Sequence, residues 1–277
     1  EKEIKRSLIS QKGNGITIID IQTVSGGCIN NASKISTNLG TFFLKWNNNA
    51  DYKLFEAEVK GLELLRNTKT IYIPKLISYN HKYLMMEFVE NETPSNISWQ
   101  AFGRDLSELH KVSNISFGLD HNNFIGSLFQ KNNQHPNWID FFINQRIIPQ
   151  LSIGNFSSEL RKSFSKVFLK IEDLFPDEPS SLLHGDLWNG NFLIDKDKAV
   201  LIDPAVYFGS REMDIAMTKL FGGFHDQFYS AYNENYPLSY GWEERIDICN
   251  LYPLLVHANL FGGGYYAQVK TIIERFS

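Results

Sequence analysis

Three side chains near the middle of the sequence have the chemical types and the spacing that phosphoryl transfer requires. Asp186 lies in the run 183–194, Asn191 follows five residues later, and Asp203 comes near the end of the next apolar run, 200–204. In kinases, the first aspartate of such a set accepts the proton of the attacking hydroxyl, while the asparagine and the second aspartate hold magnesium on the nucleotide phosphates. The pattern therefore predicts ATP and Mg2+ as cofactors, with Asp186 as the base and the other two side chains as metal ligands.

The reaction needs few protein groups, because phosphoryl transfer depends on positioning and charge neutralisation more than on covalent help. One base and two oxygen ligands suffice. Taken singly, His184-Gly185-Asp186 and Asp203-Pro204 are also ordinary turn sequences. Their combination with Asn191, just outside the ends of two short apolar strands, favours the catalytic interpretation.

The composition is that of a globular protein without a nucleic-acid or membrane partner. The 277 residues include 27 basic and 31 acidic side chains, and no basic stripe for a phosphate backbone is present. The two cysteines, Cys28 and Cys249, make neither a disulfide framework nor a metal cluster, which favours a reducing cytoplasm. No apolar run is long enough to span a bilayer, and the charged start 1–3 is not that of a signal peptide.

The first ninety residues predict a small antiparallel sheet with one helix. Apolar residues at helical spacing indicate a helix over 51–67, and β-branched or aromatic runs bounded by turn residues indicate strands. The expected strands cover 16–24, 32–37, 41–46, 73–79 and 83–89. The polar, proline-containing stretch 90–95 then predicts a boundary between an N-terminal lobe, 1–90, and a C-terminal lobe, 91–277.

Two features of the N-terminal lobe could hold nucleotide phosphates. Gly26 and Gly27 lie between the first two strands, where missing side chains would let the backbone of a flap approach the phosphates closely; a common turn is the alternative. Lys45 ends the third strand and could reach the α- and β-phosphates if a helix carboxylate held it. Glu58 is the preferred partner and Glu56 the second candidate, although solvated side chains are the usual fate of such residues.

The adenine ring is expected at the lobe boundary. In a two-lobed kinase the backbone here would bond the adenine edge, which makes Glu87, Phe88 and Val89 hinge candidates. A buried strand that simply leaves the sheet is equally compatible with these residues.

Beyond the boundary the pattern becomes helical. Asp214 is expected to cap the helix that follows Asp203, and His110 to be a packed or capping residue rather than a ligand. The polar stretch 118–136 predicts a long loop near the substrate. The interval between Asp203 and the next helix is too short for a protein-kinase activation segment, so the acceptor is expected to be a small molecule or a small adduct on a protein. The expected helices cover 99–109, 138–148, 156–175 and 243–260.

The runs 184–191 and 203–217, with Phe221-Gly222-Gly223-Phe224, closely resemble the fructosamine kinase family, whose ketosamine 3-kinases belong to the wider aminoglycoside and choline kinase group. The match extends to 25–30, 43–45 and 55–62, and so covers nearly the whole chain. The resemblance implies an α+β, protein-kinase-like two-lobed fold, with a small sheet and one helix in the first lobe and a mainly helical second lobe.

The resemblance also implies ATP-dependent phosphorylation of the 3-hydroxyl of a ketosamine, the rearranged adduct of a sugar and an amine. The phosphate makes the adduct unstable, so the activity would be a deglycation repair. It implies that Lys45 binds phosphate with Glu58 as its ion-pair partner, and that Met86 to Val89 match the adenine hinge. Trp188 and His184, beside the base, are candidate substrate contacts. Ser210 departs from the histidine of many relatives, and the acceptor preference therefore does not transfer.

Several alternatives stay open at this point. The rival activities are another small-molecule kinase, of the aminoglycoside or choline type, and a catalytically silent nucleotide-binding regulator. The acceptor could be free or protein-bound, and a monomer or a weak dimer is expected. Cys28 beside Gly27 could also be redox-regulatory, since oxidation in the flap would obstruct ATP; an inert loop cysteine is the alternative.

Overall fold

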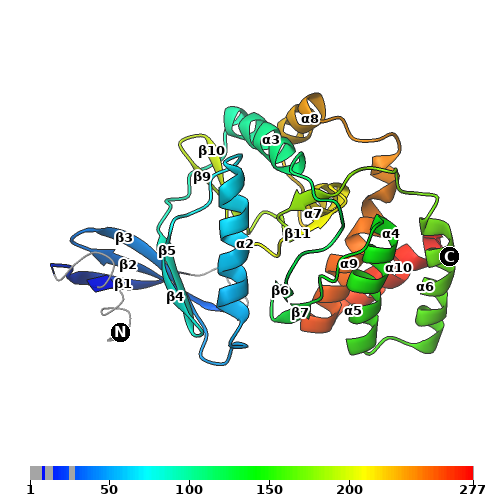
Figure 1. Cartoon of the computed structure of the whole chain (residues 1–277), viewed down its shortest axis with the longest axis horizontal. Coiled ribbons are helices and arrows are strands. Elements are labelled where there is room, and N and C mark those ends of the chain that lie inside the picture. Colours follow the sequence, from blue (N-terminus) through cyan, green and yellow to red (C-terminus); the bar gives the residue numbers. More distant parts are fainter. Residues whose placement is uncertain (1–7, 10–14, 25–28, 277) are drawn as a thin grey trace.

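The computed structural model describes residues 8–9, 15–24 and 29–276. A five-stranded antiparallel sheet lies at one end of the molecule and a larger, mainly helical part at the other (Figure 1). Helix α2 stands between them, alongside the sheet and facing the helical part. None of the helices in the described part of the chain is long and apolar enough to cross a membrane.

The sheet has the strand order β1-β2-β3-β5-β4. Side chains alternate between the faces of β3, so that Leu44 joins Ile35 and Met85 in a small apolar cluster on one face. Lys45 points to the opposite face, towards α2. The strands are β1 (Ile18–Val24), β2 (Asn31–Thr37), β3 (Gly40–Trp46), β4 (Leu76–Asn80) and β5 (Tyr83–Glu87).

Helix α2 (Leu54–Thr68) buries an apolar stripe that includes Phe55, Leu62 and Leu65. The helix also approaches the segment after Asp203 closely at Gly61. A Cβ atom on Gly61 would lie 3.1 Å from the Val206 side chain, so the missing side chain permits this contact. The helix that carries Glu58 is therefore packed against the backbone that follows Asp203.

Short strand pairs in the second part carry the sequence runs singled out above. Strand β8 (Ser181–Leu183) pairs with β11 (Tyr207–Gly209), and β9 (Phe192–Asp195) pairs with β10 (Lys198–Leu201), both antiparallel. The helices are α3 (Asn96–His110), α4 (Trp138–Phe141), the π-helix η1 (Phe142–Ile147), α5 (Ile148–Ile153), α6 (Ser158–Ile171), α7 (Glu212–Leu220), α8 (Asp226–Asn235), α9 (Trp242–Phe261) and α10 (Gly264–Phe276).

Two sequence predictions in this part are wrong in detail. The stretch 118–136 is not one long loop, because it contains the hairpin of β6 (Asn123–Ile125) and β7 (Leu128–Gln130). The helix expected to end before Pro149 continues to Ile153. Pro149 lies in the first turn of α5, where a backbone N–H is not needed, directly after a π-helical segment.

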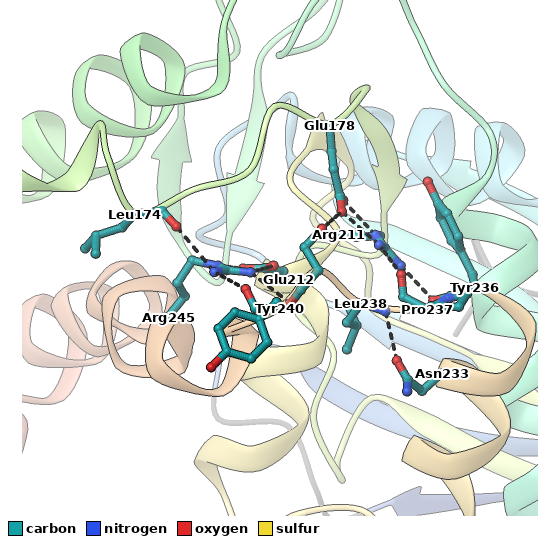
Figure 2. A network of polar contacts seen from close by, with 11 residues as sticks. Leu174, Glu178, Arg211, Glu212, Asn233, Tyr236, Pro237, Leu238, Tyr240 and Arg245 are labelled. Carbon is teal, nitrogen blue, oxygen red and sulfur yellow. Dashed lines mark hydrogen bonds and ion pairs between the residues drawn. The ribbon is translucent and has the colours of Figure 1, made fainter.

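Two ion pairs, one buried and one partly buried, hold the start of α7 (Figure 2). Arg211 donates from Nε and Nη2 to the carboxylate of Glu178, at 2.8 and 2.9 Å, and its other bonds reach carbonyl oxygens of the 236–237 segment. Arg245, on α9, donates to both oxygens of Glu212, at 2.7 and 2.6 Å. Because such bidentate pairs are geometrically specific, they fix where the first turn of α7 lies.

We expect Gly103→Ala to lower the free energy of unfolding by about 3 kcal/mol, because overpacking against backbone cannot relax easily. Helices α3 and α8 meet at Gly103, where a Cβ atom would lie 2.3 Å from the Phe228 carbonyl oxygen and 2.9 Å from the Tyr232 backbone nitrogen. Chemical denaturation measures the change.

The matched control is Gly264→Ala, at the start of α10, where an added Cβ meets nothing within 4 Å. It should leave stability unchanged or raise it by about 0.5 kcal/mol. Equal stability of the Gly103 variant and the parent chain would show that the contact between α3 and α8 is looser than described.

Candidate active site

A cleft of about 780 Å³ runs between the sheet and the helical part, and the predicted catalytic residues converge in it. Residues distant in the sequence meet there because the first turns of α2, the end of β3 and the segments 186–191 and 202–205 between the short strands all border the cleft. The predicted residues among its lining are Lys45, Glu58, Asp186, Trp188, Asn191 and Asp203, together with Met86 to Val89.

Asp186 lies just after β8, in a turn where Gly185 has a φ of +83° and its backbone lies against the carbonyl of Ala205. Asn191 Nδ2 donates to the Asp186 side-chain Oδ2 at 2.9 Å and to its backbone oxygen at 2.8 Å. Burial raises the pKa of Asp186 to about 7, the nearby Asp203 carboxylate adds to this, and the bond from Asn191 opposes it. A carboxylate of this kind is suited to accept a proton near neutral pH.

Asn191 and Asp203 offer oxygen atoms to a cation. Because the amide hydrogens of Asn191 are turned to Asp186, its Oδ1 is left without a donor in the part of the chain that the structure describes. Asp203 follows β10 with a φ of +54°, and its side chain is about one-third exposed in the cleft. One amide and one carboxylate oxygen, completed by phosphate oxygens, form a donor set that suits Mg2+.

Lys45, on β3, joins the sheet to α2 through Glu58 and to the segment after β10 through Asp203. Its Nζ lies 3.0 Å from each oxygen of Glu58 and 3.0 Å from Asp203 Oδ1. Burial alone would lower the pKa of Lys45, but the carboxylates of Asp203 and Glu58 outweigh burial and hold that pKa above its usual value. Lys45 is therefore a fixed cation. The sequence preference for Glu58 over Glu56 is confirmed, because Glu56 instead pairs with Lys60 on the exposed side of α2.

His184 does not reach the cleft, and the prediction that it contacts the substrate is wrong. Its side chain is fully buried. The backbone N–H of Asp186 donates to Nδ1 at 3.3 Å, so Nε2 carries the proton and donates to the Ile202 carbonyl at 2.9 Å. Burial also lowers the pKa of His184, which favours this neutral form. Its position indicates a role in holding the two backbone segments that carry Asp186 and Asp203.

Asp214 is not the N-cap that the sequence predicted, because α7 already begins at Glu212. Its carboxylate instead accepts the backbone N–H groups of His184 and Gly185, at 2.7 and 2.9 Å, and contacts His110 Nε2 at 3.2 Å. It therefore caps the turn before Asp186 rather than its own helix. His110 is packed in the core, as predicted.

The segment that ends β5 lines the cleft at the side of the sheet. Met86 is buried, and the N–H groups of Glu87 and Phe88 donate to carbonyls of neighbouring chain segments. The N–H of Val89 bonds to no group within residues 15–24 and 29–276. Met86 to Val89 thus border the cleft, which is the position that an adenine-binding hinge requires. The predicted flap residues Gly26, Gly27 and Cys28 lie outside the described residues.

The opposite end of the cleft has an aromatic wall that the sequence only partly indicated. Trp188 meets Phe221 edge-on with ring centroids 5.8 Å apart, and Phe221 lies 4.9 Å from His257. His257 Nδ1 donates to the Pro253 carbonyl at 2.7 Å, so its Nε2 is an acceptor. His257 and Tyr265, which contacts it at 5.1 Å, come from α9 and α10. Sequence analysis named neither His257 nor Tyr265, because these side chains follow no local motif.

Comparison with known proteins identifies the family. The model of the fructosamine kinase family matches residues 1–277. The chain is a member of the fructosamine kinase family. A probable ketoamine kinase of Synechocystis is 35% identical over 98% of this chain and 95% of its own. The chloroplastic protein-ribulosamine 3-kinase of Arabidopsis thaliana is 36% identical over 98% of this chain and 86% of its own.

Solved structures support the same placement. A candidate fructosamine-3-kinase from Thermobifida fusca superposes with a TM-score of 0.91 at 30% identity, over 99% of this chain and 98% of that one. The aminoglycoside phosphotransferase APH(4)-Ia shares the fold alone, with a TM-score of 0.65 at 15% identity. The predicted α+β, protein-kinase-like two-lobed fold of this chain is thereby confirmed.

We expect Asp214→Asn to lower the free energy of unfolding by about 2 kcal/mol, since an amide cannot replace a carboxylate that accepts three hydrogen bonds. Because the turn before Asp186 loses its anchor, turnover should also fall by about 100-fold. Denaturation and steady-state kinetics measure the two effects. Asp226→Asn, which changes an exposed first-turn aspartate of α8, is the matched control and should alter neither. Normal turnover in the Asp214 variant would contradict the anchoring role.

Proposed function

We propose that this protein is an ATP-dependent kinase that phosphorylates the 3-hydroxyl of ketosamines and so acts in deglycation. The observation that carries the proposal is the convergence of Asp186, Asn191 and Asp203 with the Lys45–Glu58 pair in one cleft, in a chain of the fructosamine kinase family. Relatives across the whole chain are named ketoamine kinase and protein-ribulosamine 3-kinase.

In this proposal each residue has one task. Asp186 accepts the proton of the acceptor hydroxyl as the oxygen attacks the γ-phosphorus of ATP, while the bond from that phosphorus to the β–γ bridging oxygen breaks and ADP leaves. A pKa near 7 suits Asp186 to that task. Lys45, held by Glu58, binds the α- and β-phosphates. Asn191 Oδ1 and Asp203 hold magnesium, which supplies charge neutralisation on the phosphates.

The nucleotide is proposed to lie along the sheet side of the cleft, with its adenine against Met86 to Val89. The Val89 N–H is available to bond the adenine edge, and a flap with Gly26, Gly27 and Cys28 is proposed to cover the phosphates. The lobe boundary is proposed near residue 90. It is supported by the bonds of the 91–92 segment to β9, which include Glu92 N to the Ile194 carbonyl at 2.9 Å.

The acceptor is proposed to bind at the aromatic wall. Trp188 offers a flat apolar surface to one face of the sugar carbons, within two residues of the proposed base. The acceptor nitrogen Nε2 of His257 can receive a hydrogen bond from a hydroxyl or amine of the adduct. The 3-phosphate would destabilise the adduct and release the amine. A cytoplasmic monomer or weak dimer remains the expected form.

A panel of acceptors tests the proposal directly. With Mg-ATP, we expect phosphate transfer to ribulosamines and fructosamines, free or on a protein, and at most trace transfer to aminoglycosides. The aromatic wall matches a sugar face, and the side chains described for it, Trp188, Phe221, His257 and Tyr265, include no carboxylate to hold a polycation. Transfer to aminoglycosides alone would support the rival small-molecule kinase, and transfer to none would support a silent nucleotide-binding regulator.

Replacement of the base gives a second test. Asp186→Asn should lower kcat by at least about 100-fold, because general base catalysis is lost, while nucleotide affinity changes by no more than about twofold. Single-turnover kinetics and nucleotide titration measure the two quantities. Asp195→Asn, at the end of β9, is a control that should retain activity. If the Asp186 variant turned over at the parent rate, another group would have to accept the proton.

A further inference from the structure

The hairpin of β6 and β7 holds a buried network of side-chain amides that the proposed reaction does not use. Asn123 and Gln130 face each other across the two strands and are 3% and 1% exposed. Asn132, just after β7, is also buried. Burying amides is costly unless every donor and acceptor is paired, so a network of this kind imposes one geometry on its neighbours.

Asn123 is the centre of this network. Its Oδ1 accepts hydrogen bonds from Gln130 Nε2 and Asn132 Nδ2, both at 2.8 Å. Its Nδ2 donates to the Val206 carbonyl at 2.8 Å. Although Asn123 borders the cleft, both amide atoms are already engaged with the protein. It is therefore better suited to hold the backbone than to bind a ligand.

The outer members of the network tie it to three other elements. Gln130 donates a second bond to the Ala205 carbonyl at 3.1 Å and accepts one from Tyr252 of α9 at 2.6 Å. Asn132 accepts a bond from Arg146, on the π-helix, at 2.7 Å. The guanidinium of Arg146 is fully buried and lies 3.9 Å from the ring centroid of Tyr207. The hairpin is thus anchored in the helical part of the molecule.

The backbone that the network holds leads directly to the proposed magnesium ligand. Ala205 and Val206 follow Asp203 by two and three residues. The Val206 side chain packs on Gly61 of α2, the helix that carries Glu58. A shift of this segment would therefore change the separation between Asp203 and the Lys45–Glu58 pair, now 3.0 Å from Lys45 Nζ to Asp203.

We propose that Asn123 is a positioning residue for Asp203: its bond to the Val206 carbonyl sets the place of the metal-binding carboxylate relative to Lys45 and Glu58, and thereby the affinity for magnesium with nucleotide. The inference rests on the proposed role of Asp203 as a magnesium ligand. It goes beyond the proposed reaction, because it assigns a task to a hairpin that carries no catalytic group.

The test compares two equally drastic truncations in the same network. Asn123→Ala removes the bond to Val206, whereas Asn132→Ala removes an equally buried amide that does not touch residues 205–206. The full chain is titrated with Mg2+ at fixed ADP, and the rise in melting temperature that magnesium adds is recorded. This readout needs neither an acceptor nor turnover.

We expect the Mg2+ midpoint of Asn123→Ala to rise about 10-fold, as for loss of a group that orients a metal ligand, and that of Asn132→Ala to stay within about 1.5-fold. Both should melt at lower temperature without ligand. Equal midpoints in the parent and both variants would show that Asn123 is only structural and would overturn the proposal.

Tyr252→Phe gives a milder second variant if Asn123→Ala does not fold. It removes only the hydroxyl bonded to Gln130, and we expect the Mg2+ midpoint to rise about threefold, about half of the full effect in free energy. An unchanged midpoint in this variant would count against the network. If Mg2+ did not raise the melting temperature of the parent chain with ADP, both the metal-binding role of Asp203 and this inference would be wrong. Failure to phosphorylate ketosamines, in contrast, would leave the inference standing.

Discussion

A single ammonium group lies between two carboxylates where the sheet meets the helical part of the molecule. Lys45 comes from β3, Glu58 from α2 and Asp203 from the segment after β10. Taking a lysine out of water is costly, and the cost is offset only when opposite charges lie within contact distance. The position of each of these elements is therefore constrained by the other two. The pairing of the Lys45 ammonium group with Glu58 and Asp203 therefore fixes how β3, α2 and the segment after β10 are placed around the cleft.

A second set of contacts, made by Asp214 and His184, holds the backbone segments that carry Asp186 and Asp203. The carboxylate of Asp214 holds the turn before Asp186, and His184 links that turn to the Ile202 carbonyl beside Asp203. The ion pairs of Arg211 and Arg245 in turn fix the first turn of α7, where Asp214 lies (Figure 2). Buried polar groups that are fully paired tend to impose one arrangement. The segments that carry the proposed catalytic side chains are therefore held by paired polar groups on the side away from the cleft.

Much of this could be read from the sequence where the signal is local. Alternating strands, the periodicity of α2 and the spacing of Asp186, Asn191 and Asp203 all follow from neighbours along the chain. The choice of Glu58 for Lys45 succeeded because helical periodicity put Glu58 beside the apolar stripe. His184 and Asp214 were misjudged for the opposite reason. Their partners lie far along the chain, and only packing decides whether a polar side chain faces a cleft or a buried backbone amide.

The same limit applies to the hairpin of β6 and β7 and to the aromatic wall. Each strand of the hairpin has three residues, too few to show an alternating pattern. Its polar amide side chains are also typical of a loop, so the sequence predicted a loop. His257 and Tyr265 come from two different helices and meet only across the turn between α9 and α10. Whether residues such as Gly26, Gly27 and Cys28 act as expected stays a prediction.

The left-handed backbone at Asp203 has a consequence for how this position can vary. With a φ of +54°, most side chains would be strained there by roughly 1 kcal/mol or more, whereas asparagine and aspartate tolerate the conformation. Position 203 thus meets two independent requirements. The backbone conformation favours a short polar side chain, and the neighbouring Lys45 ammonium group favours a negatively charged one. Only aspartate meets both requirements. Fewer amino-acid types should therefore be tolerated at position 203 than at Asp186, whose backbone imposes no such restriction.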